Sequence, residues 1–308
     1  MYKKVFIIGN GFDLDLGCKT SYKDFINSDY WPLKDKEPDC LMAEYLKDRT
    51  CFDRWYDLES LLKEYASYKP HNHIKANPQD EEFFYELRKC LISFLKDAIK
   101  STVNPDSMAI KVLREVARNG YFSSIYTFNY TDLYDIAEKV DINMRFDYEP
   151  VHGCLANNSI ILGVSDSANL RDGYSYLRKV FNEHYTSHFI RYDLQECDEV
   201  VFFGHSLGEN DYPYFADFFE DQSQCSERKD SKRITIFTKD NNSRFQILEQ
   251  LRLMNGGRTE RLQNDNDFKI IMTDNPDKVL LKKFFDNLSN ESQASHDRNM
   301  EHVSSMLL

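Results

Sequence analysis

The chain has 308 residues, 41% of them hydrophobic and 14% aromatic, which is enough to bury the core of one large domain. Its formal net charge is −12 and its basic clusters are interrupted by acidic or apolar residues, which argues against direct nucleic-acid binding. The seven cysteines lack C-x-x-C spacing and no apolar run suits a signal peptide or a membrane span. We therefore expect a cytoplasmic protein with no disulfide framework, no cysteine zinc site and no membrane association.

Short apolar runs with the length of buried strands recur along the chain. They lie at residues 3–8, 123–128, 159–164, 199–204, 233–238 and 268–273. Amphipathic helical patterns lie between or after them, including residues 81–99, 243–254 and 277–288. This alternation predicts an α/β fold with a mostly parallel, Rossmann-like sheet that helices cover on both faces.

The stretch from about residue 28 to residue 120 has helical patterns and many aromatic residues but no strand pattern. We predict a helical insertion or subdomain here, after the first strand, within a single α/β domain that spans residues 1–288. Residues 289–308 are polar and are expected to form a poorly ordered C-terminal tail.

Gly9 and Gly11 directly follow the first predicted strand, and a helix is expected near Ser21, where Asp24 completes a capping box. Glycines in this place let backbone amides approach a phosphate. The spacing fits neither the dinucleotide fingerprint, since Leu14 stands where its third glycine would be, nor the P-loop. The loop therefore either contacts a phosphate or only makes a turn.

Asn129 follows the second predicted strand in YTFNYTD, and Thr131 or Asp132 is expected to cap the next helix. Open α/β sheets bind ligands at the carboxyl ends of their strands. A side-chain amide there can hold a ribose hydroxyl or a water, although an asparagine in a turn would give the same pattern.

His152 stands in PVHGC, after a short run that could be a strand. A histidine at a strand end can act as a general base or bond to a sugar, and it can equally be structural. His184 and His188 have the spacing of two metal ligands on one helix face. Because no third ligand accompanies them, we predict no metal site.

The sequence GHSLG at residues 204–208 matches the G-x-S-x-G pattern of a serine-hydrolase nucleophile elbow. An elbow requires a helix directly after the serine and a catalytic histidine later in the chain. Here Asp211 is the expected N-cap of the next helix, with Pro213 in its first turn, so loop residues follow Ser206. The only later histidines lie in the polar tail. A serine hydrolase that uses Ser206 is therefore an alternative to a ligand-binding loop.

Five stretches together resemble the AbiH family of bacterial abortive-infection proteins, which act in phage defence. They are IIGNGFDLDLGCKTSYKDF, WYDLE (55–59), YTFNYTD, VHG and FFGHSLGENDYPYF. The matches follow the order of the family from the N-terminus to about residue 220. The resemblance implies a phage-derived trigger or a partner protein, and a homo-oligomer is compatible with it.

The order of these loops is also similar to that of sirtuin-like NAD-hydrolysing domains. This similarity implies a cofactor-binding loop, a catalytic pair and a late binding loop. The cofactor-binding loop would contain Gly9, Asn10, Gly11 and Asp13. The catalytic pair would be Asn129 and His152, and the late binding loop would contain Gly204, Ser206 and Asp211. The chain departs from the sirtuin-like pattern at Asn10, Phe12 and Asp13. Asn10 and Asp13 could therefore recognise a different nucleotide or act as catalytic groups themselves. The chain also has Thr131 where an aspartate is expected.

These patterns predict a phage-defence protein that binds a nucleotide, NAD by resemblance, and hydrolyses its nicotinamide glycosidic bond. Such a reaction passes through an oxocarbenium-like state, so the protein must orient the ribose and a water. Asn129 would hold the ribose or the water, and His152 would accept a proton. Glu59 either reaches the site as a carboxylate or only caps or solvates its helix. The alternative is a non-enzymatic module that senses a nucleotide or a phage component.

Overall fold

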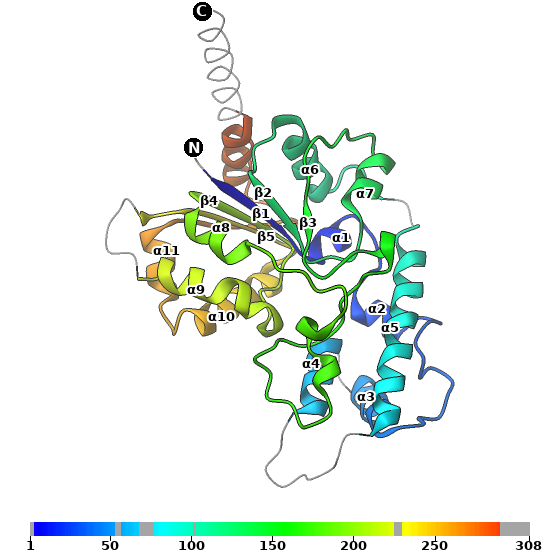
Figure 1. Ribbon diagram of the computed structural model, residues 1–308. Helices are drawn as coiled ribbons and strands as arrows, with labels where there is room; N and C mark the ends of the chain where they lie inside the picture. Colours follow the sequence, from blue (N-terminus) through cyan, green and yellow to red (C-terminus); the bar gives the residue numbers. More distant parts are fainter. Residues whose placement is uncertain (1–2, 53–56, 68–76, 101–102, 225–229, 290–308) are drawn as a thin grey trace, which may run out of the picture.

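Six parallel strands form one sheet in the order β3-β2-β1-β4-β5-β6 (Figure 1). They are β1 (Lys4–Ile8), β2 (Ser124–Thr127), β3 (Glu149–Pro150), β4 (Glu199–Phe203), β5 (Arg233–Thr238) and β6 (Asp267–Met272). The structure is a computed structural model and describes residues 3–52, 57–67, 77–100, 103–224 and 230–289. Every residue of β1 and β4 is buried, which explains the apolar runs that follow the first residue of each strand. The predicted α/β fold with a parallel sheet is confirmed.

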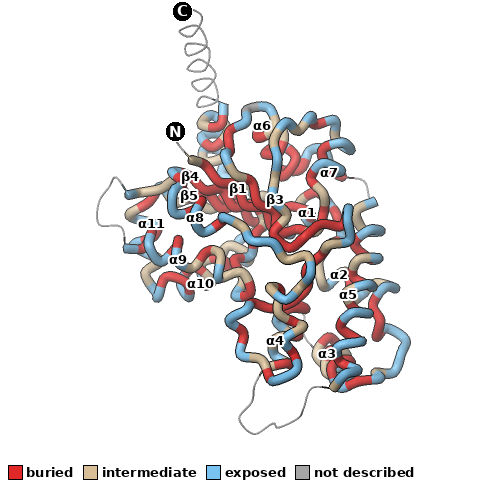
Figure 2. The backbone as a smooth tube through the Cα atoms, viewed as in Figure 1, coloured by how far each residue is buried: buried red, intermediate tan, exposed pale blue. Residues whose placement is uncertain are grey.

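Helices cover both faces of this sheet. One face carries α1 (Gly11–Asp15), α6 (Met108–Asn119), α7 (Leu133–Lys139) and the helical residues 278–289. The other face carries α8 (Ile190–Glu196), α9 (Tyr212–Gln222), α10 (Asn241–Met254) and α11 (Thr259–Asp265). Because side chains alternate along a strand, Phe6 and Ile8 enter the first core, whereas Val5 and Ile7 enter the second. Figure 2 shows the sheet as a continuously buried layer between the two groups of helices.

A third core lies beyond the carboxyl end of the sheet, as the lower part of Figure 1 shows. Its helices are α2 (Tyr22–Ile26), α3 (Leu41–Phe52), α4 (Leu58–Ala66) and α5 (Pro78–Ala98). The predicted run of helices after the first strand is confirmed, and the capping box at Ser21 and Asp24 does begin α2. Within residues 28–120, however, α6 packs on the sheet and not on these helices.

Residues 151–189 connect β3 to α8, and we call them the linking segment. This segment contains three single-turn 3₁₀ helices, η1 (Leu155–Asn157), η2 (Ser175–Leu177) and η3 (Lys179–Phe181). The strand predicted at residues 159–164 is wrong, because only an isolated bridge between Val164 and Arg178 forms there. The run is apolar because Ile160, Leu162 and Val164 fill the third core.

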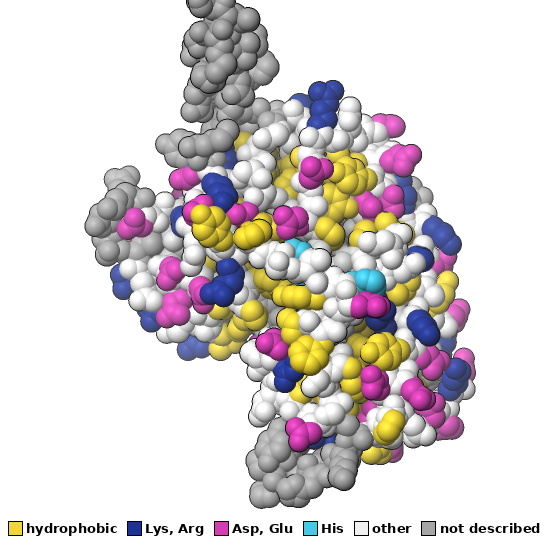
Figure 3. All heavy atoms as spheres, viewed as in Figure 1, with side chains coloured by type: hydrophobic (Ala, Val, Ile, Leu, Met, Phe, Trp, Pro, Cys, Tyr) yellow, Lys and Arg dark blue, Asp and Glu magenta, His cyan; other side chains and the backbone are white. Residues whose placement is uncertain are grey.

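The remaining helical predictions also hold: α5 covers residues 81–98, α10 covers 243–254, and residues 278–289 are helical. The predicted polar tail lies outside the described residues from residue 290 onward. In the part of the chain that the structure describes, no helix combines the length and apolarity needed to cross a membrane. Lys and Arg side chains are interspersed with Asp and Glu on the face drawn in Figure 3, without a large basic patch.

Candidate functional site

The strand register brings four polar residues to one level at the carboxyl edge of the sheet. Ile8 of β1 pairs with Thr127 of β2 and with Phe203 of β4, and Thr127 in turn pairs with Pro150 of β3. Two residues beyond these positions stand Asn10, Asn129, His205 and His152. Neighbouring strands lie about 4.8 Å apart, so residues from distant parts of the chain gather along this edge.

The sheet order reverses between β1 and β4, which is where open α/β sheets form their ligand crevice. In this protein the two loops touch there directly. The Gly11 amide donates to the Gly204 carbonyl at 2.8 Å. A Cβ on Gly9 would lie 2.5 Å from His205 Cα, and Gly204 has a φ of +65°. Close packing of the loops therefore accounts for these glycines, and their contact with a phosphate stays a prediction.

Asp13 of α1 lies at the centre of a buried polar cluster beside these loops. The Asn129 side-chain amide donates to Asp13 Oδ1 at 2.9 Å, and the Thr131 hydroxyl donates to Oδ2 at 2.9 Å. Burial raises the pKa of Asp13 to about 7, although both hydrogen bonds lower it. The other end of the amide, Asn129 Oδ1, is buried without a partner among the described residues. Asn10 is exposed and accepts a hydrogen bond from Thr20.

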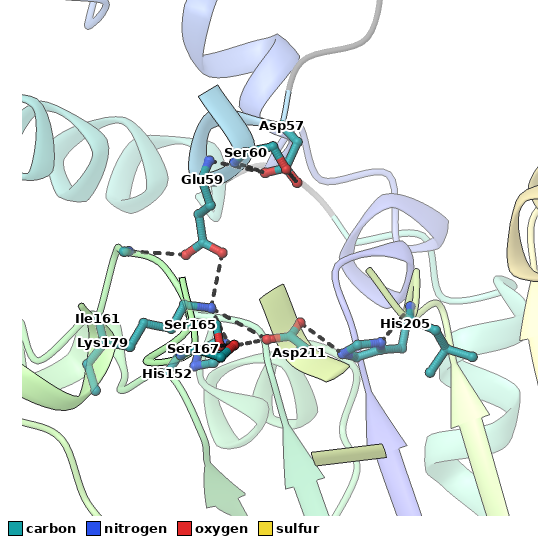
Figure 4. Close-up of polar contacts among 12 residues, drawn as sticks. Asp57, Glu59, Ser60, His152, Ile161, Ser165, Ser167, Lys179, His205 and Asp211 are labelled. Atoms are coloured by element: carbon teal, nitrogen blue, oxygen red, sulfur yellow. Dashed lines mark hydrogen bonds and ion pairs between the residues drawn. The ribbon is translucent and has the colours of Figure 1, made fainter. Parts of the chain in front are cut away.

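A second cluster surrounds the ammonium group of Lys179, which the linking segment supplies. Figure 4 shows this group between the carboxylates of Glu59 and Asp211. Lys179 Nζ lies 3.0 Å from Glu59 Oε2, 3.4 Å from Asp211 Oδ1 and 3.1 Å from His152 Nε2. His152 Nε2 is also 3.0 Å from Asp211 Oδ1. The Lys179 ammonium group thus connects α4 of the third core, through Glu59, to the loop region after β4, through Asp211.

His205 completes this cluster on the far side of Asp211. Its Nδ1 accepts a hydrogen bond of 2.9 Å from the Leu207 amide, so a neutral ring carries its proton on Nε2. That Nε2 faces Asp211 Oδ2 at 3.5 Å. The Phe128 ring packs edge-on against the rings of His152 and His205, at centroid distances of 5.1 and 4.5 Å. The aromatic contacts help to exclude water from the two imidazoles.

Burial and charge pairing shift the protonation of these groups in different directions. Burial, together with the Lys179 ammonium, lowers the pKa of His152 to about 4, against the influence of Asp211. Burial raises the pKa of Glu59 to about 7, although Lys179 lowers it. Burial disfavours the charge of Asp211, yet Lys179 and hydrogen bonds from His152 and His205 hold its pKa well below the usual range. At neutral pH His152 is therefore neutral and Asp211 is ionised.

The local sequence explains why two of these carboxylates are available to the site. Asp211 is the N-cap residue of α9 and Pro213 lies in its first turn, as predicted, but the Asp211 side chain makes no capping bond. Glu59 does not cap α4, because Asp57 accepts the amide hydrogen bonds there. Glu59 is 8% exposed and accepts a hydrogen bond from the Gly163 amide. The alternative in which Glu59 only caps or solvates its helix is wrong.

Ser206 and two histidines lie apart from these clusters. Ser206 is exposed, loop residues separate it from α9, and no hydrogen bond within the described residues joins its hydroxyl to a histidine. His184 and His188 lie in a loop and not on a helix, so their spacing does not place them on one helix face. No group of three metal-binding side chains occurs within residues 3–52, 57–67, 77–100, 103–224 and 230–289.

Sequence reasoning missed Lys179, and it named His205 only as part of a motif. Lys179 stands in the apolar stretch YLRKVF, where a lone lysine gives no motif signal. Its burial in the structure, with 4% of the residue exposed, reveals its role in joining the elements. Trp55 and Tyr56 of WYDLE lie outside the described residues.

Comparison with protein families identifies the chain at family level. The family model described as bacteriophage abortive infection AbiH matches residues 5–229. The matched range begins in β1 and ends after α9, so it contains every member of both clusters. No curated protein matches the chain. Because the match covers well over half of its length, the chain belongs to the AbiH family of bacteriophage abortive infection proteins.

Proposed function

We propose that this phage-defence protein binds a nucleotide at the carboxyl ends of β1, β2 and β4 and hydrolyses the nicotinamide glycosidic bond of NAD. The observation that carries the proposal is the buried contact between Asp13 and Asn129. A carboxyl group whose pKa is raised to about 7 can exchange a proton at physiological pH. Perturbed groups of this kind concentrate at functional sites. The choice of NAD rests on the similarity of the loop order to sirtuin-like domains.

The chemistry requires a base and a group that orients the ribose. As the glycosidic bond breaks, its electron pair goes to the nicotinamide nitrogen and positive charge develops on the ribose. A water oxygen then bonds to the anomeric carbon and gives up a proton. Asp13 in its ionised form would accept that proton, while the unpartnered Asn129 Oδ1 would accept a hydrogen bond from the water or from a ribose hydroxyl.

His152 takes a different part in this proposal from Asp13. A group with a pKa of about 4 is a weak base at neutral pH, so proton transfer falls to Asp13. The neutral imidazole of His152 would bond to a ribose hydroxyl. Gly204, Ser206 and Asp211 would form the wall of the site on the β4 side, where Ser206 is exposed to a ligand.

The test is release of nicotinamide from NAD by the purified protein, measured by chromatography. Wild-type protein should release nicotinamide, alone or after phage infection of the producing cells, and Asn129→Ala and Asp13→Asn should reduce the rate by at least about 100-fold. Asn242→Ala is the matched control, because Asn242 is exposed on α10. Failure of the wild type to release nicotinamide under both conditions would exclude the hydrolase.

A non-enzymatic nucleotide sensor is the second candidate. One observation favours the sensor. The titratable side chains around Lys179 form ion pairs and hydrogen bonds with one another, and the linking segment contributes Lys179 and His152 to them. A ligand would have to displace these contacts, and such a rearrangement could transmit a signal. Calorimetry that detects NAD binding without nicotinamide release, together with growth arrest that survives Asn129→Ala, would support the sensor over the hydrolase.

A further inference from the structure

We propose that Lys179 is a positioning residue that keeps His152 in its neutral form, and that the linking segment thereby controls the charge at the sheet edge. The consequence for catalysis rests on the proposed function, whereas the control of His152 is a property of the protein alone. Lys179 stands in a stretch of sequence that no motif marks.

Lys179 enters the cluster from η3 with only 5% of its side chain exposed. Its ammonium group donates to the carboxylates of Glu59 and Asp211 and lies 3.1 Å from Nε2 of the His152 ring. A protonated His152 would place a second positive charge 3.1 Å from this ammonium in a water-poor environment. Such a contact between like charges is strongly unfavourable.

The charged and titratable groups around His152 come from separate elements. Lys179 comes from the linking segment, Asp211 from η4 (Glu209–Asp211) and His205 from the loop after β4. Glu59 of α4 acts on the ring through Lys179. The Phe128 ring beside His152 carries no charge, and burial raises the pKa of Tyr214, so that its ring is neutral as well. Asp211 alone would favour an imidazolium, whereas burial of the ring and, after it, the Lys179 ammonium oppose one.

This arrangement suits the proposed reaction. An imidazolium beside the ribose would oppose the positive charge that develops as nicotinamide leaves. Lys179 does not oppose it in the same way, because Glu59 and Asp211 pair with its charge. Together with burial, Lys179 therefore disfavours the imidazolium form of His152 and leaves a neutral hydrogen-bonding ring.

The experiment is an NMR titration of the histidine rings in the full chain without nucleotide. Loss of one signal in His152→Gln assigns the resonance. In the wild type the His152 resonance should not titrate above about pH 5, and Lys179→Met should raise its pKa by at least about one unit, since burial then opposes the effect of Asp211 without the Lys179 ammonium. Lys179→Arg keeps the positive charge and should keep the low pKa.

Lys63→Met is the matched control. Lys63 of α4 pairs with Glu209 of η4 at 2.8 Å, so this outer ion pair joins the same two elements as Glu59 and Asp211. The control should leave the His152 titration unchanged. If Lys179→Met does not fold, the wild-type titration still decides: a His152 resonance that titrates above about pH 6 overturns the proposal.

The two proposals fail in different ways. If wild-type protein releases no nicotinamide but His152 shifts in Lys179→Met, the hydrolase is excluded and the control by Lys179 stands. If nicotinamide is released but His152 has the same pKa in wild type and Lys179→Met, the control by Lys179 is excluded and the hydrolase stands.

Discussion

The side-chain amide of Asn129 donates a hydrogen bond of 2.9 Å to the carboxyl group of Asp13, across 116 positions of sequence. The bond joins the loop after β2 to α1. It places a carboxyl that is only 1% exposed at the edge of the sheet where ligands bind in this class of fold. Such a carboxyl is costly to ionise, and the cost can be measured without knowing the ligand.

We expect the stability of the protein to fall as the pH rises through neutrality because of Asp13. The folded-state pKa of Asp13 is about 7, above its ordinary value of 3.8, so the folded state binds the proton more tightly than the unfolded state. The stabilisation is complete below the unfolded pKa and is lost as the pH rises toward 7. Between pH 5 and pH 8 the loss from this group should be roughly 2 to 3 kcal/mol. Urea unfolding at pH 5 and at pH 8 measures this loss of unfolding free energy.

Asp13→Asn should remove this part of the pH dependence, because the amide cannot ionise. Asp97→Asn serves as the control, since Asp97 is exposed on α5 and pairs with the exposed Lys100. The control should retain the wild-type decline. Equal declines in wild type and Asp13→Asn would contradict a buried carboxyl that titrates near neutrality.

Gly11 should resist replacement because of its contact with the loop after β4. A Cβ on Gly11 would lie 2.6 Å from Gly204 Cα, and backbone cannot move aside as a flexible side chain can. We expect Gly11→Ala to lower the free energy of unfolding by about 3 kcal/mol. Gly208→Ala is the control, because the nearest atom to its added Cβ is Ser206 Oγ at 3.4 Å. Similar unfolding midpoints for the two variants would show that the loops are not tightly packed.

Much of the fold could be predicted because a parallel sheet buried on both faces has a distinctive sequence. After their first residue β1 and β4 are wholly apolar, and helices lie between these strands along the chain. The same apolar pattern led to the wrong prediction of a strand at residues 159–164, where the apolar residues fill the third core without forming a strand. A short apolar run indicates that a segment is buried, but burial alone does not distinguish a strand from an irregular segment.

The candidate site was only partly predictable, for a related reason. Asn129 and His152 could be placed at the sheet edge because each follows a strand, and parallel strands end at the same edge. The contact of Glu59 with Lys179 depends on how α4 and the linking segment pack against each other. No local pattern encodes that tertiary contact, so sequence reasoning left Glu59 undecided and passed over Lys179.

Ser206 should not behave as a catalytic nucleophile. Its hydroxyl is exposed, and the adjacent His205 ring is engaged by the Leu207 amide and faces Asp211. A serine needs a base within hydrogen-bonding distance to attack a carbonyl. We expect a fluorophosphonate probe to leave the protein unlabelled, as judged by mass spectrometry, and Ser206→Ala to give the same result. Labelling of the wild type that disappears in Ser206→Ala would revive the serine hydrolase.

Asp211 should be more important for stability than other aspartates of its region, because it is the ionised partner of a buried ammonium. Asp211→Asn would remove one of the two carboxylates that pair with Lys179, and the other, Glu59, has a raised pKa of about 7. Removal of one member of a buried ion pair costs about 3 to 5 kcal/mol, and retention of the amide shape should place the loss at the lower end. Asp217→Asn is the control, since Asp217 of α9 pairs with Arg191 at the exposed surface. Exposed pairs contribute little, so urea unfolding should show almost no change for the control. If both variants unfold at the wild-type midpoint, Asp211 does not balance the charge of Lys179.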